Sequence, residues 1–161
     1  LFDDVNRDVW GGDGRVFQLI APAKPSLKVK IDHNTATTAG NAFLVMGDSV
    51  VVSLGARFTN NIVIKGDYGA FGSGKGEGTG ALSFFMPDAV FANTAIVGAL
   101  AGSYPTGNHF PATVAAVGFK DAAAGDYSLL ASSSYKGKGS DGKDLGADMA
   151  GLTAAIAGVV K

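Results

Sequence analysis

The chain has 161 residues, of which 47% are apolar and none is cysteine, and its formal net charge is -1. A chain of this length is typical of one domain with a substantial core. The balanced charge argues against a nucleic-acid partner, because binding a phosphate backbone requires a basic surface. The absence of cysteine excludes disulfides, thiolate metal sites and cysteine nucleophiles, and no apolar run is long enough to predict a membrane span.

Short apolar runs separated by glycine-rich turns predict a chain made mostly of strands. In chain order, the predicted strands are Leu1–Val5, Arg15–Ala21, Leu27–Ile31, Ala42–Val45, Val50–Leu54, Phe58–Ile64, Ala81–Phe85, Ala89–Phe91 and Thr94–Val97. The predicted turns and loops between them are Asn6–Gly14, Tyr68–Gly80 and Ser103–Pro111. Apolar residues of Met149–Val160 recur about once per helical turn, which fits a terminal helix, with a last strand or a frayed end as alternatives.

A short phrase recurs along the chain: an apolar residue, two variable residues, an asparagine and a β-favouring pair. It occurs at Ile31–Ala36, Phe58–Val63 and Val90–Ala95, with a degenerate copy at Leu1–Val5. A period of about 30 residues is typical of a stacked, repetitive fold. Asparagine tolerates the left-handed backbone of a tight corner and can hydrogen-bond its counterpart in the next repeat. We therefore predict a structural ladder formed by Asn34, Asn61 and Asn93.

The repeats and the C-terminal part of the chain resemble right-handed parallel β-helix proteins of the pectate-lyase-like superfamily, of the bacterial secreted type. Gly125–Leu129 and Gly139–Ala147 are similar to the strand "G-D-Y-x-L" and the string "G-x-D-G-x-D-I-G-A" that close many such proteins. Ser134 stands where that family usually has proline. Because Leu1 begins inside a repeat, the resemblance also implies a C-terminal fragment of a longer protein.

The fold that this resemblance implies is all-β: a right-handed parallel β-helix, or solenoid, of about four coils. The coils would occupy residues 1–131, and a C-terminal closing segment with its tail would occupy residues 132–161 of the same single domain. The family is mostly exported, so an extracellular or cell-surface location and a polysaccharide partner are expected.

Three functions stay open at this point. The first is a non-catalytic module that is carbohydrate-associated or structural. The second is a fragment of a polysaccharide lyase or hydrolase that acts on an acidic glycan. The third is a self-assembling surface or fibre protein that associates through an open N-terminal coil, because unpaired strand edges invite further strands. Catalysis is the less favoured of these expectations.

A lyase of this kind needs a base and a group that neutralises the substrate carboxylate, often calcium. The weak catalytic candidates are Lys30, Asp32, His33 and Arg57. The simpler interpretation of these residues is a solvated β face with cross-strand charge pairs. Asp141 and Asp144 are weak candidates for calcium, but they lack the spacing of a calcium loop, so no cofactor is expected.

Aromatic side chains in loops suggest a different site, because sugar rings stack on exposed aromatic faces. Trp10, Tyr68 and Tyr104 lie in or beside predicted loops and are the candidates for ligand binding. Trp10 precedes two glycines and is the first of the three to test. Its alternative role is a lid over an open end of the solenoid.

Overall fold

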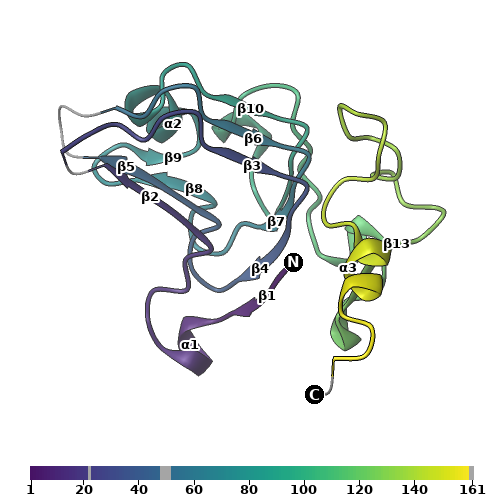
Figure 1. Ribbon diagram of the computed structural model, residues 1–161. Coiled ribbons are helices and arrows are strands. Elements are labelled where there is room, and N and C mark those ends of the chain that lie inside the picture. Colours follow the sequence, from purple (N-terminus) through teal and green to yellow (C-terminus); the bar gives the residue numbers. More distant parts are fainter. Residues whose placement is uncertain (22, 48–51, 160–161) are drawn as a thin grey trace.

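The computed structural model describes residues 1–21, 23–47 and 52–159, where strands from successive passes of the chain pair in parallel (Figure 1). One sheet consists of β1 (Phe2–Val5), β4 (Thr35–Thr38), β7 (Ile62–Ile64) and β11 (Ala95–Val97). A second consists of β3 (Lys30–Asp32), β6 (Arg57–Thr59) and β10 (Val90–Ala92). A third consists of β2 (Phe17–Ala21), β5 (Phe43–Gly47), β8 (Ala70–Gly72) and β9 (Gly76–Glu77), of which β9 runs antiparallel to β8.

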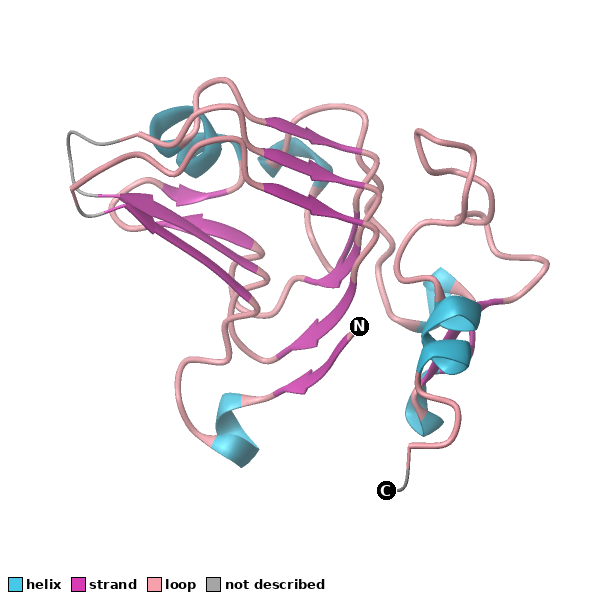
Figure 2. Ribbon diagram, in the orientation of Figure 1, coloured by secondary structure: helices cyan, strands magenta, loops and turns pink. Residues whose placement is uncertain are grey.

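Helical elements and an antiparallel hairpin complete the described chain (Figure 2). The α-helices are α1 (Arg7–Trp10), α2 (Thr79–Phe85) and α3 (Met149–Ala155). Short 3-10 turns are η1 (Ala101–Ser103), η2 (Ala115–Val117) and η3 (Ala122–Ala124). The hairpin pairs β12 (Phe119–Asp121) with β13 (Asp126–Leu129).

The expected all-β fold, a right-handed parallel β-helix of about four coils, is wrong. Helices account for 18% of the structure and strands for 31%, and parallel and antiparallel strands occur together in several short sheets. The fold is therefore mixed. One cause is the apolar run Ala81–Phe85, which was predicted as a strand but belongs to α2, because Ala81, Leu82 and Phe85 lie on one helical face and are buried.

Other predicted elements also change. The predicted turn at Asn6–Gly14 contains α1, which begins after Asn6 because the Asn6 side chain accepts a hydrogen bond from the N–H of Asp8. Residues 50 and 51 of the predicted strand Val50–Leu54 lie outside the described residues, while Leu54 forms a single parallel bridge with Leu27. Met149–Ala155 forms α3 behind an Asp148 cap, and Val160 lies outside the described residues.

Phenylalanine rings join the sheets in the main core. Phe43 of β5 lies 5.3 Å from Phe58 of β6 and 5.7 Å from Phe91 of β10, both measured between ring centroids. Phe17 of β2 stacks on Phe43 with 5.4 Å between ring centroids. These edge-on and stacked contacts are the geometries that aromatic rings favour. The repeated phenylalanines therefore hold the second and third sheets together.

A second, smaller core lies on the other face of the first sheet. Val63 and Ile96 belong to the main core, whereas their neighbours Ile62 and Ala95 pack with Leu145 in the second one. This alternation follows from the strand geometry, in which successive side chains point to opposite faces. Val117, Leu129 and the C-terminal residues thus cover the sheet that carries β7 and β11, as the green and yellow ribbon beside the body shows (Figure 1).

Residues 132–148, which we call the closing loop, attach to the body through specific hydrogen bonds. The side-chain oxygen of Asn60 accepts a hydrogen bond from the N–H of Ser140, and the backbone carbonyl of Asn60 accepts one from the N–H of Gly146, both at 2.8 Å. Thr35 accepts from the N–H of Ala147 at 3.0 Å. Gly146 has φ 83° and a Cβ placed on it would lie 2.5 Å from the Thr35 hydroxyl. Only glycine therefore fits this contact.

Candidate functional site

The corner between β3 and β4 is held by a pair of stacked asparagines. Asn34 donates from its backbone N–H at 2.9 Å and from its amide at 3.1 Å to Oδ1 of Asn61. Asn61, which has no exposed surface, donates in turn to the carbonyl of Ile31 at 3.0 Å. These bonds satisfy buried polar groups, so the two asparagines have a structural role.

Asn93 does not join this column. Ala92 pairs with Thr59 and Ala95 pairs with Ile62, so Asn93 lies opposite Asn60, and Thr94 takes the position opposite Asn61. Asn93 has φ 49° and Asn60 has φ 59°, and both are therefore the left-handed residues of their corners. The repeat phrase marked the correct corner but the wrong residue within it.

Asn108 supplies the missing amide at this third corner. Its Oδ1 accepts from the N–H of Thr94 at 3.0 Å, and its amide donates to the carbonyl of Phe91 at 2.9 Å. Asn61 makes the same two bonds at the first corner, to the N–H of Asn34 and the carbonyl of Ile31. Asn108 lies in a predicted loop outside the repeats, and no local sequence signal marks it.

Three of the catalytic candidates lie on the second sheet, where their own contacts engage them. Lys30 Nζ lies 2.9 Å from the Asp32 carboxylate, and Arg57 is the register partner of Lys30 on β6. Asp32 also accepts from Thr59 Oγ1 at 2.7 Å and from the Asn60 amide at 2.8 Å. Burial raises the pKa of Asp32, but these hydrogen bonds outweigh it, and the pKa lies below its usual value. An ionised, fully engaged carboxylate is suited to holding the strands together rather than to taking up a proton.

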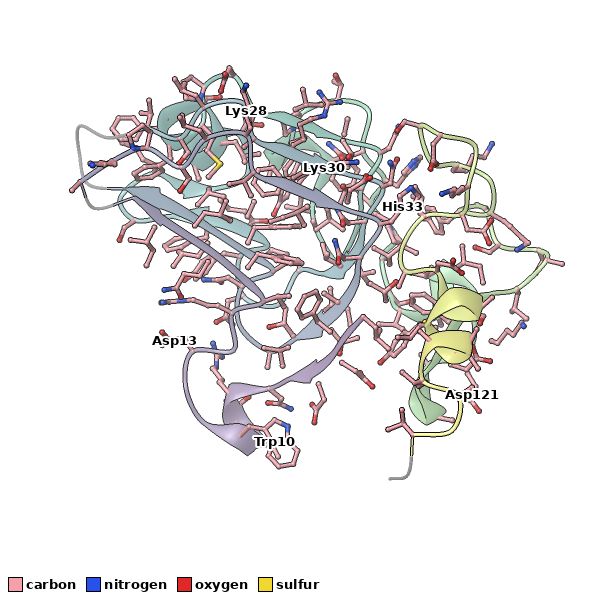
Figure 3. The ribbon with its side chains drawn as sticks, viewed as in Figure 1. Trp10, Asp13, Lys28, Lys30, His33 and Asp121 are labelled. Carbon is pink, nitrogen blue, oxygen red and sulfur yellow. The ribbon has the colours of Figure 1, made fainter. Side chains whose placement is uncertain are left out.

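His33, the fourth candidate, faces the closing loop instead of the second sheet (Figure 3). Its Nε2 lies 3.3 Å from the Asp141 carboxylate and is buried, without a well-aligned hydrogen bond. Lys30, Asp32 and Arg57 therefore lie on the second sheet, whereas His33 contacts the closing loop.

The two calcium candidates are engaged separately. Asp141 accepts from the N–H of Lys143 at 3.1 Å, whereas Asp144 accepts from Lys136 Nζ and from the N–H of Gly137, each at 2.8 Å. Across residues 1–21, 23–47 and 52–159, no three His, Asp or Glu side chains converge as metal ligands would. Each carboxylate is therefore engaged by its own neighbours in the closing loop.

Tyr104 is a structural residue rather than a surface for a ligand. Only 5% of it is exposed, and its hydroxyl donates toward the carbonyl of Tyr68 or the Glu77 carboxylate and accepts from the N–H of Ala70. Burial raises its pKa above the usual value of 10.0. Tyr68 is 48% exposed, but its ring stacks on Phe71 with 4.8 Å between centroids, so one face is covered.

Trp10 is the candidate whose ring remains available. It is 72% exposed at the end of α1, and its Nε1 donates to the Asp4 carboxylate at 2.7 Å, which holds the edge of the ring in place. Arg7, on the same helix, forms an ion pair with Asp67 and so fastens α1 to the chain between β7 and β8. Figure 3 shows Trp10 projecting from the body away from Lys28, Lys30 and His33.

A hollow of about 350 Å³ lies beside Trp10. Its polar lining comes from Asp4, Asn6, Asp13, Arg15 and Gln18. Arg15 Nη1 lies 2.8 Å from the Asp13 carboxylate, while Arg15 Nε is buried and has no hydrogen-bond partner within the described residues. The hollow therefore combines an anchored aromatic ring with several hydrogen-bonding groups.

No family model matches the chain, and no curated protein or solved structure matches it either. In the part of the chain that the structure describes, none of the helices combines the length and hydrophobicity of a membrane span.

Proposed function

We propose that this protein is an extracellular, non-catalytic module that binds carbohydrate at the Trp10 hollow. The single observation that carries the proposal is the tryptophan itself: a large, mostly exposed ring whose edge is fixed by Asp4 beside a polar hollow. Water solvates an exposed aromatic face poorly, so a partner that covers the ring gains free energy by removing it from water. The proposed location rests on the resemblance of the repeats and closing loop to exported proteins.

The chemistry of the hollow suits a sugar ring. The C–H face of a pyranose packs against an indole face, while its hydroxyls need donors and acceptors around the rim. Asn6 and Gln18 supply both kinds of group, and Arg15 supplies donors. The hydrogen bond from Trp10 to Asp4 fixes the ring in advance, which lowers the entropy cost of binding.

The charge of the hollow favours a neutral glycan over an acidic one. Asp4 and Asp13 contribute two negative charges and Arg15 contributes one positive charge, so the lining sums to -1. A polyuronate would bring further negative charge to the same place and be repelled. We therefore expect neutral oligosaccharides to bind more tightly than oligogalacturonate.

The chain contains one tryptophan, so its fluorescence reports this site alone. Titration with neutral gluco- and manno-oligosaccharides should change the fluorescence saturably, and oligogalacturonate should change it less. Calorimetry should show that Trp10→Ala weakens binding by at least about tenfold, equal to about 1.4 kcal/mol. Tyr68→Ala removes another exposed aromatic ring that lies outside the hollow and should bind as the unmodified protein does. Equal affinity of the Trp10→Ala variant would refute the proposal.

Self-association is a second candidate, supported by the strand order. β1, β2 and β3 are each the last strand of their sheet, and the nearby side chains of Phe2, Ile20 and Leu27 are exposed. Unpaired backbone groups and apolar side chains together favour pairing with the same edge of a second copy.

Light scattering during size exclusion tests this second candidate. The mass should rise with protein concentration, and the double variant Ile20→Lys and Leu27→Lys should remain monomeric. Leu100→Lys is the matched control, because Leu100 is also exposed but lies after β11, away from those three edges. A monomer at every concentration excludes association through this edge.

A further inference from the structure

A second cavity, of about 580 Å³, lies between the body and the C-terminal residues. His33 lines it from the corner after β3, and the remaining lining comes from β12, β13, the closing loop and the start of α3. None of its lining residues belongs to the Trp10 hollow. Its volume lies within the range of small-molecule sites in proteins.

The lining contains both apolar and cationic side chains. Leu129 and Leu145, both buried, contribute apolar surface together with Met149. Lys120, Lys136 and Lys143 supply the cations. Sites for amphipathic ligands share this combination of apolar surface with a few polar groups that fix orientation.

The acidic residues of the lining already have partners in the fold. Asp144 binds Lys136 and the N–H of Gly137, and Asp148 accepts from the N–H of Gly151 at 2.9 Å as the cap of α3. Three lysines against these two carboxylates leave the lining at +1 with His33 neutral.

Two lysines remain available for a ligand. Lys120 makes no ion pair among the described residues, and Lys143 Nζ is 3.6 Å from Asp141, a loose and exposed contact. Lys120 and Lys143 are thus the lysines of the lining that the fold holds least tightly, although Asp126 and Asp141 offset part of their charge.

We propose that this cavity binds a small organic carboxylate with an apolar body. The carboxylate binds between Lys120 and Lys143, and the body packs on Leu129, Leu145 and Met149. A charge-assisted contact to a lysine is stronger than a neutral hydrogen bond, and the apolar wall adds affinity for the body. This site goes beyond the proposed carbohydrate function, because neither its residues nor its ligand are those of the Trp10 hollow.

Proton NMR of the two histidines tests the site directly. His33 lines the cavity, whereas His109 packs against Tyr135 and serves as the internal reference. Benzoate is the probe, benzamide is its neutral analogue, and acetate carries the charge without the apolar body. We expect benzoate to move the His33 imidazole signal saturably with a Kd near 1 mM or below, and the other two compounds to bind at least about tenfold more weakly.

Lysine variants connect the signal to the proposed contacts. Lys120→Ala should weaken benzoate binding by about fivefold, and the double variant with Lys143→Ala should reduce it to the affinity of benzamide. Lys138→Ala removes an exposed lysine of the same loop that does not line the cavity, and it should leave the affinity unchanged. A retained wild-type amide spectrum shows that each variant is folded, and His109 is the reference only in the Lys120 and Lys143 variants, because Lys138 acts on the His109 imidazole directly.

Three results would overturn the proposal. One is the absence of saturation with benzoate up to about 20 mM. Another is benzamide or acetate binding as tightly as benzoate, which removes the need for one of the two contacts. The third is unchanged benzoate affinity in the folded double lysine variant.

Discussion

Replacing Asn61 by alanine tests whether the asparagine corner stabilises the fold. The change removes the three hydrogen bonds that join Asn61 to Asn34 and Ile31. It leaves the N–H of Asn34 without its partner and removes one donor from the carbonyl of Ile31, at a position where Asn61 itself has no exposed surface. An unsatisfied buried group costs about 1–3 kcal/mol, so the free energy of unfolding should fall by about 3 kcal/mol.

Urea unfolding followed by circular dichroism measures this loss, and thermal unfolding should show a Tm lower by about 6–12 °C. Asn108→Ala is the matched comparison, because Asn108 makes the equivalent bonds at the third corner but is only partly buried. Water can replace some of its bonds, so its loss should cost only about 1 kcal/mol. The reasoning fails if Asn61→Ala stays within about 0.5 kcal/mol of the unmodified protein, or if Asn108→Ala costs more.

Three further predictions concern packing and pH. Gly146→Ala should lower the free energy of unfolding by more than about 2 kcal/mol and speed hydrogen exchange in the closing loop. Gly98 has a similar φ of 81° but open space around it, so Gly98→Ala should lower the free energy of unfolding by only about 1 kcal/mol. Equal losses in the two variants would contradict the packing argument. Burial raises the pKa of Tyr104 above 10.0 and that of Tyr127 to about 12. The unfolded chain therefore ionises first, so urea stability should fall as the pH rises above 10, and by less in Tyr104→Phe; an equal fall in both proteins would count against Tyr104. The pKa of Asp32 is lowered below 3.8, so the stability that Asp32 contributes is present above that pH and is lost as the pH falls further. In the same urea assay, the stability of Asp32→Asn should depend less on pH in the acid range. An unchanged loss of stability in acid would mean that other carboxylates cause it.

The sequence identified the corners better than it identified the overall fold. Asn34 and Asn61 share an offset in their repeats, and this offset places them in contact. In the third repeat Asn93 adopts the left-handed position, so the amide has to come from Asn108. An asparagine at the same position of each repeat phrase does not determine which residue of the corner adopts the positive φ. Asparagine is suited both to that left-handed position and to the ladder.

The exposure of the aromatic candidates could not be read from their neighbours in sequence. Trp10 and Tyr104 both lie beside glycine-rich or polar loops, yet one is exposed and the other is buried. The burial of Tyr104 depends on partners more than 25 positions earlier in the chain, at Tyr68, Ala70 and Glu77. Such long-range contacts override the local pattern, as they also do for α2.

The sheet of β4, β7 and β11 separates two cores, and this division has a consequence for synthesis of the chain. In the described residues, β12 and β13 pair only with each other, so the second core is held to the sheet by side-chain packing and not by strand pairing. A nascent or truncated chain that ends before residue 112 would expose the apolar side chains of Ile62, Ala95 and Val97 to water. Such a product should recruit chaperones or precipitate, even with every strand of the body in place.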